Sequence, residues 1–492
     1  MDSHVVLFLT NAELSQANVH LAVAYELLLR PGYDVHIASF EPLRDEVDML
    51  NAAIATLTPT SPANSATFHR LAGATLKEAF AQHPELAAEH LRAPGFGIRA
   101  TAAYKGLIPV TLALWDNGAD YLTIYHSCVG AIQQARPTLI AVDPFLAPGI
   151  DACQVTNSRF CLLSPNTFLE HIPSLRLTKP WKYPQINSGF PFPVPLKLIL
   201  PNIYLLIRLI FALRSAPVCK SLEQFRNANG IPGPTPSLLN TQLRRVPCLL
   251  PSRRDTDFPC SIPSNFTCCG PILRPYRPIT EENPTLATWL ARQSTVLVNM
   301  GSHVTWTPLE TARFAAGLKT LLAHRADIQV LWKLARAFPD GQLLSQHSME
   351  GLETIVKFIQ NDRVKVLSWL PVEPISVLQS GRVVCMVHHG GSNSYHEAIR
   401  AGVPHVILPV WLDTYDFAAR VEWLGIGVWG SHRTAPIVDS GDLGAALMRV
   451  MASSESAGMM QRAQRIANGL GTEGRVVACE KIVEMVSKTL GK

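Results

Sequence analysis

The fold of this chain is decided by the stretch Val387-His388-His389-Gly390-Gly391-Ser392-Asn393-Ser394-Tyr395-His396-Glu397. The apolar run 383–387 is of strand type, and the two glycines that follow it let the backbone turn sharply and approach a ligand. A helix can then begin, capped by Ser392 or Asn393, and it ends at Gly402-Val403-Pro404 before another apolar strand. This order predicts a parallel α/β sheet, in which ligands bind beyond the carboxyl ends of the strands.

The start of this helix has the chemistry of a diphosphate site. A helix N-terminus presents free N–H groups and the positive end of the helix dipole. His389 can donate a further hydrogen bond, and Asn393 and Ser394 can hold phosphate oxygens. Glu397, one turn into the helix, can accept hydrogen bonds from ribose hydroxyls, and Asp413 in the loop after the next strand can do the same for a sugar.

At these residues the chain resembles the UDP-glycosyltransferases of glycosyltransferase family 1, and its double-His, double-Gly form resembles their fungal and sterol-type branch. The family box runs His-Cys-Gly-Trp-Asn-Ser-x-x-Glu, then Gly-Val-Pro, then Pro-x-x-x-Asp-Gln. The residues that match it are His389, Gly391, Asn393, Ser394, Glu397, Gly402-Val403-Pro404, Pro409 and Asp413. Upstream, Trp369-Leu370-Pro371 is similar to the family's Trp-x-Pro-Gln, whose Trp stacks on uracil, and Gly301-Ser302 is similar to the end of a family strand.

The resemblance implies an α/β protein of GT-B fold, in which two Rossmann-like, doubly wound domains face a cleft. We expect an N-terminal acceptor-binding domain over 1–270, with an apolar helical insertion at about 190–215. A linker over 271–284, a UDP-sugar-binding domain over 285–470 and a last helix over 471–492 that packs back on the first domain complete the expected organisation. Apolar runs predict strands at 5–9, 33–39, 139–143, 295–299, 328–332, 364–367, 383–387 and 405–408.

Composition excludes several classes of protein. Of the 492 residues, 47% are hydrophobic and 16% charged, which favours a large core over disorder. The net charge of +5 comes without a run of Lys or Arg, so we expect no nucleic-acid partner. Ten cysteines without metal spacing, and no charged region before the first apolar strand, predict free thiols and a cytoplasmic location. The spacing of His388, His389 and His396 does not fit a zinc site, so no metal is expected.

The apolar segment 196–213 has two interpretations. Lys197, Pro201, Asn202 and Arg208 interrupt it, so a full membrane span is not expected. It can be a helix that covers the acceptor pocket. Alternatively, it is an interfacial helix that gives the protein a peripheral contact with a bilayer or collects an oily acceptor.

Two positions depart from the family pattern on the donor side. Thr414 stands where the family has the Gln that contacts sugar hydroxyls, which leaves the donor sugar open. Val372 stands where Trp-x-Pro-Gln has its Gln.

The family's catalytic base is also missing. It is the His of Gly-His-x-Asn at the start of the first helix, and here Gln16 takes its place, with an amide that cannot accept a proton at neutral pH. Asp143, at the end of a strand, matches the Asp that orients this His in the family. Three alternatives remain. His20 swings in from one turn further along; Asp143 acts directly or through a water; or another residue such as His126 serves, or the acceptor is acidic enough to need little help. A general base is worth typically about 10² to 10⁴ in rate.

The resemblance thus implies an inverting transfer of a hexose, glucose by default, from a UDP-sugar to a hydroxyl of a hydrophobic terpenoid, sterol or polyketide. No metal or other cofactor is expected, because a helix N-terminus and His389 can neutralise the leaving diphosphate. The alternatives are a non-catalytic UDP-sugar-binding protein or subunit, which the missing His favours, and a membrane-associated lipid glycosyltransferase.

Overall fold

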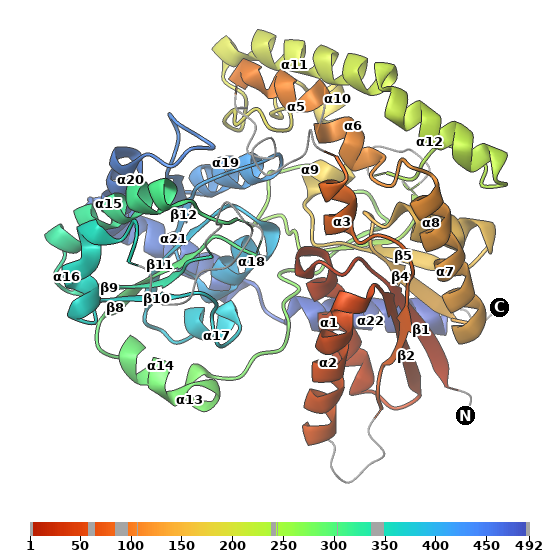
Figure 1. Ribbon diagram of the computed structural model, residues 1–492, viewed down its shortest axis with the longest axis horizontal. Coiled ribbons are helices and arrows are strands. Elements are labelled where there is room, and N and C mark those ends of the chain that lie inside the picture. The colour runs from red at the N-terminus through yellow and green to blue at the C-terminus, as the bar shows by residue number, and fades with distance from the viewer. Residues whose placement is uncertain are drawn as a thin grey trace.

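The computed structural model describes residues 3–57, 64–83, 97–105, 107–237, 243, 245–302, 304–335 and 349–488. Within them the chain forms two parallel sheets, each flanked by helices (Figure 1). The expected GT-B architecture of two Rossmann-like domains is therefore confirmed.

The N-terminal sheet has the strand order β3-β2-β1-β4-β5-β6-β7. Its strands are β1 (His4–Leu9), β2 (Tyr33–Ser39), β3 (Thr67–Arg70), β4 (Leu139–Val142), β5 (Phe160–Leu163), β6 (Cys248–Leu250) and β7 (Phe266–Cys268). The helices around it are α1 (Leu14–Leu28), α2 (Arg44–Leu57), α3 (Leu76–Ala81), α5 (Thr101–Lys105), α6 (Leu107–Leu112), α7 (Ala119–Ala135), α8 (Ala147–Val155), α9 (Phe168–His171), α10 (Ser174–Thr178), α11 (Leu196–Ser215) and α12 (Pro217–Ala228).

The C-terminal sheet has the order β10-β9-β8-β11-β12-β13. Its strands are β8 (Ser294–Asn299), β9 (Ile328–Lys333), β10 (Val364–Leu367), β11 (Val383–His388), β12 (His405–Ile407) and β13 (Gly427–Trp429). Its helices are α13 (Ile279–Glu282), α14 (Pro284–Leu290), α15 (Pro308–His324), α16 (Val356–Gln360), α17 (Pro374–Leu378), α18 (Ser392–Ala401), α19 (Thr414–Leu424), α20 (Ser440–Ala452) and α21 (Ser456–Gly469); α22 (Gly474–Ser487) ends the described chain.

Both sheets reverse their strand order at an inner strand, and these switch points position the site. In the first sheet β1 pairs with β2 on one side and β4 on the other, so the loops after β1 and β4 leave the same edge. In the second, β11 lies between β8 and β12. The inner strands are buried on both faces, because helices cover each sheet on both sides.

The last helix crosses from the second domain to the first. Ala478, Cys479 and Ile482 of α22 lie in one core cluster with the strands and helices of the N-terminal sheet. Arg475 of α22 forms an ion pair with Glu26 of α1, with 2.8 Å between Nε and Oε1.

Several element boundaries differ from the sequence-based predictions. Helix α7 begins at Ala119, and Gly118 adopts a φ of +70° at its N-cap. The proposed linker contains the short helix α13. Strands β6, β7 and β13 were not predicted, because each has only three residues, too few for a periodic pattern.

Helix α11 lies along the outside of the N-terminal domain, at the top of Figure 1. Its inner face carries Asn202, Leu205, Leu206 and Leu209, and its outer face is largely exposed. It is the one helix among the described residues whose length and composition would suffice to cross a membrane, with a mean hydropathy of 1.9 over an 18-residue window, of which 22% is buried.

Candidate active site

A cleft of about 1010 Å³ lies between the two domains, at the carboxyl ends of both sheets. Its N-terminal wall carries large apolar side chains, Leu14, Met49, Leu76, Phe80, Leu114 and Phe145, beside polar ones that include Gln16, Glu46 and Lys77. Its C-terminal wall is polar and contains all nine residues predicted for donor binding: Gly301, Ser302, Trp369, His389, Gly391, Asn393, Ser394, Glu397 and Asp413. The structure thus brings together residues spread over more than a hundred positions, while their contacts with a donor stay a prediction.

The turn between β11 and α18 depends on its glycines. Gly390 has a φ of +88°, and a Cβ there would lie 2.8 Å from the carbonyl oxygen of Thr414. The imidazole of His389 fills the space beside two other glycines, because a Cβ on Gly301 or Gly391 would lie 2.5 or 2.4 Å from its ring atoms. The N-cap residue of α18 is Gly391, which has no side chain to cap the helix, so the first N–H groups of α18 are suited to bind an anion in the cleft.

Glu397 lines the cleft from the second turn of α18 and is only 8% exposed. Burial and, less strongly, the nearby carboxylate of Glu373 raise its pKa to about 8 against the opposing effect of the Lys333 ammonium. Among the described residues no side chain or backbone group forms a hydrogen bond with its carboxyl, which is therefore suited to accept hydrogen bonds from ligand hydroxyls.

Lys333 is a cleft residue that the sequence analysis missed. Its Nζ donates a hydrogen bond to the Gly301 carbonyl at 3.0 Å and lies 3.5 Å from the ring centroid of Trp369. Burial lowers its pKa to about 8, and Glu397 opposes this shift. Because Trp369 is 56% exposed in the cleft, one part of its indole faces the ammonium while another stays open to a ligand ring.

The loop after β12 places Asp413 in the cleft and turns Thr414 away from it. Burial raises the pKa of Asp413 to about 7, with Glu170 and Asp416 contributing in the same direction. Thr414 is fully buried, and its Oγ1 accepts hydrogen bonds from the N–H groups of Val410 and Trp411. The residue at the family's Gln position therefore supports the loop and does not line the cleft.

In the N-terminal domain, Asp143 lies at the end of β4 and is completely buried. Its carboxylate accepts hydrogen bonds from Nδ2 of Asn11, at 2.8 Å, and from the N–H of Phe145, at 2.8 Å. Burial raises its pKa to about 6. Gln16, in the family's His position, lines the cleft nearby, as does Asn18.

The prediction that His20 swings into the cleft is wrong for this structure. His20 is completely buried, its ring packs edge-on against Phe8 with the centroids 6.0 Å apart, and it does not line the cleft. Burial lowers its pKa to about 3, which makes it a poor proton acceptor. The exposed His126 on α7 does not line the cleft either. The alternative with His20 depended only on its spacing of one helical turn from Gln16, and a residue at that spacing can equally face the core.

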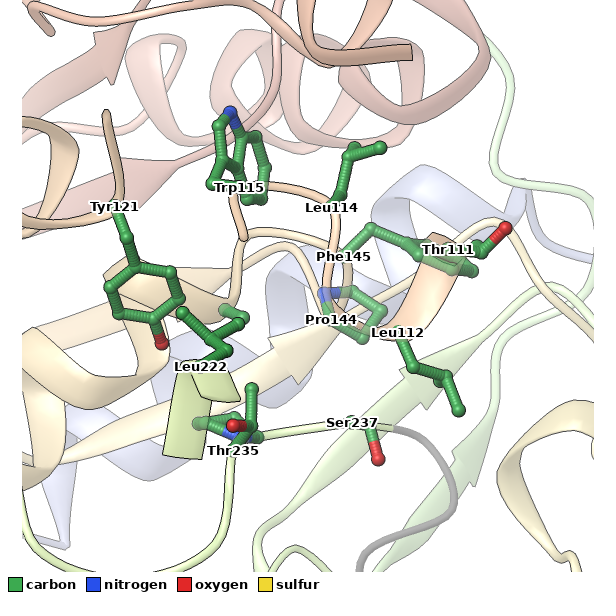
Figure 2. Close-up of a pocket in the computed structure, with 12 residues that line it drawn as sticks. Thr111, Leu112, Leu114, Trp115, Tyr121, Pro144, Phe145, Leu222, Thr235 and Ser237 are labelled. Atoms are coloured by element: carbon green, nitrogen blue, oxygen red, sulfur yellow. The ribbon is translucent and has the colours of Figure 1, made fainter. Parts of the chain in front are cut away.

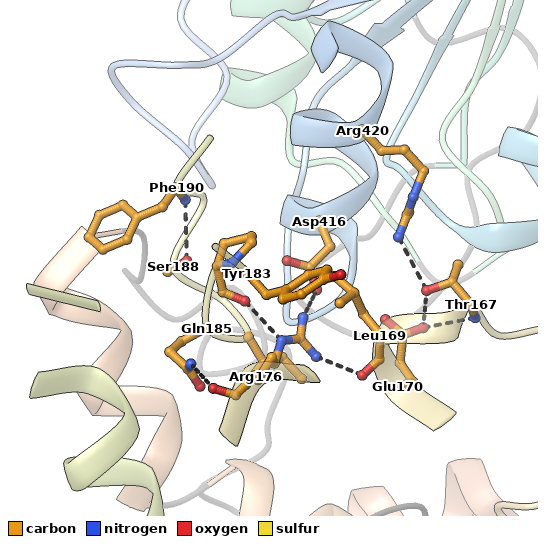
Figure 3. Close-up of polar contacts among 12 residues, drawn as sticks. Thr167, Leu169, Glu170, Arg176, Tyr183, Gln185, Ser188, Phe190, Asp416 and Arg420 are labelled. Atoms are coloured by element: carbon orange, nitrogen blue, oxygen red, sulfur yellow. Dashed lines mark hydrogen bonds and ion pairs between the residues drawn. The ribbon is translucent and has the colours of Figure 1, made fainter. Parts of the chain in front are cut away.

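The loops that line the cleft also hold the two domains together. The side chain of Asn393 donates to the Leu14 carbonyl at 3.1 Å, and Ser392 Oγ donates to the Pro165 carbonyl. Behind them, the guanidinium of Arg176 on α10 pairs with Asp416 on α19 (Figure 3).

Arg420, also on α19, forms a second buried ion pair across the interface with Asp257, with 2.8 Å between Nε and Oδ1. It also donates to the hydroxyl of Thr167 at 3.2 Å. The two domains are therefore held in contact by residues of the predicted phosphate loop and also by buried ion pairs.

An apolar side pocket of about 50 Å³ adjoins the N-terminal wall of the cleft (Figure 2). It shares Thr111, Leu114 and Phe145 with the cleft and continues past Trp115 and Leu222. The cleft as a whole thus combines an apolar wall, a polar wall with a helix N-terminus, and a buried carboxylate behind the apolar wall.

Comparison with known proteins decides the family. The family described as UDP-glucoronosyl and UDP-glucosyl transferase matches residues 206–461. The glycosyltransferase sdnJ of Sordaria araneosa is 36% identical over 480 residues, covering 91% of this chain and 90% of its own length. The chain belongs to the UDP-glycosyltransferase family. It is accordingly a glycosyltransferase enzyme that takes its sugar from a UDP-sugar donor.

Other relatives of this UDP-glycosyltransferase share smaller parts or the fold. The vancomycin aglycone glucosyltransferase of Amycolatopsis orientalis is 37% identical over 108 residues, 22% of this chain and 25% of that protein. The solved structure of a UDP-glucosyltransferase from Polygonum tinctorium, in complex with 3,4-dichloroaniline, superposes with a TM-score of 0.65 at 17% identity, covering 99% of both chains. At that identity the likeness supports the fold.

Proposed function

We propose that this UDP-glycosyltransferase moves a hexose, glucose by default, to a hydroxyl of a hydrophobic small molecule such as a terpenoid, sterol or polyketide, with inversion at the anomeric carbon. The observation that carries the proposal is the division of one cleft into a wall rich in large apolar side chains and a polar wall that holds all nine residues predicted for donor binding. A donor on the polar wall places its sugar between the two walls, where an acceptor on the apolar wall can reach it.

In the proposed reaction the acceptor oxygen attacks the anomeric carbon while the bond from that carbon to the diphosphate oxygen breaks. UDP leaves with the bonding electron pair, and its charge is stabilised by the N-terminus of α18 and by His389. Glu397 holds the ribose and Asp413 the sugar hydroxyls. The proposal needs no metal ion or other cofactor.

The acceptor's proton passes to Asp143. Because Asp143 is completely buried behind the cleft wall, we propose that a water molecule relays the proton. The raised pKa of about 6 makes this carboxylate a better acceptor for a proton than an exposed one.

The cellular location of the enzyme is part of the proposal. All ten cysteines are free thiols, which supports a reducing, cytoplasmic environment. A peripheral membrane contact through 196–213 is compatible with that location.

Mass spectrometry of products from hydroxylated terpenoids, sterols and polyketides, each offered with several UDP-sugars, tests this proposal. We expect a mass increase of one hexose on at least one hydrophobic alcohol, with UDP released in equal amount. The second candidate, a non-catalytic UDP-sugar-binding protein, is motivated by Gln16 in the cleft. Donor binding without any product or hydrolysis over the whole panel would favour it.

A further inference from the structure

The outer face of α11 is an apolar stripe that no other described part of the chain covers. Leu196, Leu200, Tyr204, Ile207 and Phe211 recur at three- and four-residue spacing, which places them on one side of the helix, and they are 43 to 88% exposed. Soluble surfaces rarely present so many large apolar side chains in a row.

The stripe is held rigidly on the body of the protein. Asn202, on the opposite face of α11, donates from Nδ2 to the carbonyls of Pro180 and Tyr183 at 2.6 and 2.9 Å, and its Oδ1 accepts from the N–H of Gln185 at 2.9 Å. These bonds anchor the middle of the helix at the surface. If α11 crossed a membrane, these hydrogen bonds would have to break. The stripe is therefore suited to bind the surface of a partner.

The chain segment that contains the stripe carries charged side chains of a single sign. Residues 171–222 contain seven Lys or Arg and no Asp or Glu, although the whole chain has 38 acidic residues. Of the seven, Arg176 is buried against Asp416, and six are at least partly exposed: Lys179, Lys182, Lys197, Arg208, Arg214 and Lys220. In the part of the chain that the structure describes, none of these six pairs with an acid.

An aromatic residue of the type found at membrane interfaces lies beside the helix. Trp181 is 56% exposed, and the two carbonyls that Asn202 binds belong to Pro180, directly before it, and to Tyr183, two residues after it. Tyr204 belongs to the stripe itself. Tryptophan and tyrosine at the margin of an apolar face, with lysine and arginine around it, are the composition of helices that lie in the headgroup region of a bilayer.

From the apolar stripe, its rigid anchoring and the unopposed positive charge, we infer that α11 docks this enzyme on the surface of an anionic lipid bilayer. The apolar side chains enter the boundary between headgroups and acyl chains while the basic side chains contact acidic headgroups. Helix α11 also packs on α6, and Thr111 of α6 lines the cleft. Only α6 therefore separates α11 from this part of the cleft wall.

Co-sedimentation of the full chain with vesicles tests the inference. One set of vesicles is pure phosphatidylcholine and the other contains phosphatidylserine. We expect the protein to sediment with the phosphatidylserine vesicles, to bind phosphatidylcholine much more weakly, and to be released by high salt. Each basic side chain near an anionic surface raises the partition coefficient about fivefold, so the combined change Lys197→Gln, Arg214→Gln and Lys220→Gln is expected to lower it about a hundredfold.

The apolar contribution is tested with Leu200→Ser, Ile207→Ser and Phe211→Ser combined. We expect this variant to lose binding to both kinds of vesicle by more than tenfold. The matched control is Leu309→Ser, which removes an equally exposed leucine, 61% exposed, from α15 in the other domain and is expected to bind like the wild type. An unchanged affinity for UDP shows that each variant is folded.

Three results would overturn the inference. The first is a wild-type protein that stays in the supernatant with both kinds of vesicle. The second is equal binding by the wild type and the apolar triple variant. The third is a wild-type dimer without vesicle binding, converted to a monomer by the apolar changes in sedimentation velocity, which would assign the stripe to contact between two copies of the chain.

Discussion

Removal of the Glu397 carboxylate is expected to weaken UDP binding by about two orders of magnitude. The side chain is 8% exposed and lines the cleft, so a ribose that binds there exchanges two hydroxyl hydrogen bonds with water for two with a carboxylate. At about 1.5 kcal/mol for each bond to a charged group, Glu397→Ala costs about 3 kcal/mol at a pH above about 8, where the carboxyl is ionised. That free energy corresponds to a dissociation constant for UDP that is about 150-fold larger.

The same carboxylate makes UDP binding depend on pH. Burial raises its pKa to about 8, so it holds a proton at neutral pH. It must release that proton to accept hydrogen bonds from both ribose hydroxyls. Between about pH 6 and pH 8 the affinity for UDP is therefore expected to rise with pH, approaching tenfold per unit at the acid end. Above pH 8 the rise stops, because the carboxyl is then already ionised before UDP binds. Lys333, whose pKa burial lowers to about 8, loses its charge in the same range.

Isothermal titration with UDP, over this pH range and in buffers of different ionisation enthalpy, measures both effects. Glu397→Gln keeps the shape of the side chain and is expected to remove the pH slope together with the proton release. Glu373→Gln is the matched control: it removes a neighbouring carboxylate that raises the pKa of Glu397, so it is expected to strengthen UDP binding at pH 7. A Glu397→Ala variant that binds UDP within twofold of the wild type, or a slope that persists in Glu397→Gln, refutes the assignment.

Three further predictions follow from buried groups. Asp143→Asn is expected to slow transfer by about 10² to 10⁴ with unchanged UDP affinity. Because burial raises the pKa of Asp143, the free energy of unfolding falls by about 3 kcal/mol as pH rises from about 4 to 6. Urea unfolding should show that the Asn variant lacks this loss. A transfer rate that is unchanged in the Asn variant would show that Asp143 takes no part in the chemistry. His20→Leu is expected to keep kcat within a few-fold, because the ring packs on Phe8 outside the cleft; a hundredfold loss in a folded, UDP-binding variant contradicts that placement. Arg176→Met leaves Asp416 buried without its cation and is expected to lower the free energy of unfolding in urea by about 3 to 5 kcal/mol at pH 8. The loss is expected to be smaller at pH 5, because burial raises the pKa of Asp416 to about 6, and the double variant Arg176→Met with Asp416→Leu is expected to recover most of the lost stability. Equal losses in the single and double variants would show that the two residues are not coupled.

The sequence alone determined the architecture of this enzyme and the donor wall of its cleft. Parallel strands that are buried on both faces appear as continuous apolar runs, so β1, β8, β9 and β11 could be predicted within a residue or two. The donor box could also be predicted, because a glycine turn, a helix start and an acid one turn later are neighbours in sequence as well as in space.

Only the tertiary structure decided which groups from distant segments share the cleft and which face the core. Asn11 and Asp143 meet because β1 and β4 are adjacent strands, although 132 residues separate them; a polar residue directly after an apolar strand was the one signal for Asn11. Lys333 reaches Trp369 because β9 and β10 pair, and its charge at the end of an apolar strand was a comparable signal. His20 shows the opposite case, since helical spacing gives two opposed faces and only packing against Phe8 determines that this ring belongs to the core. Local patterns thus fix the elements, whereas burial, and with it the pKa of every group in the cleft, is set by what the rest of the chain packs around them.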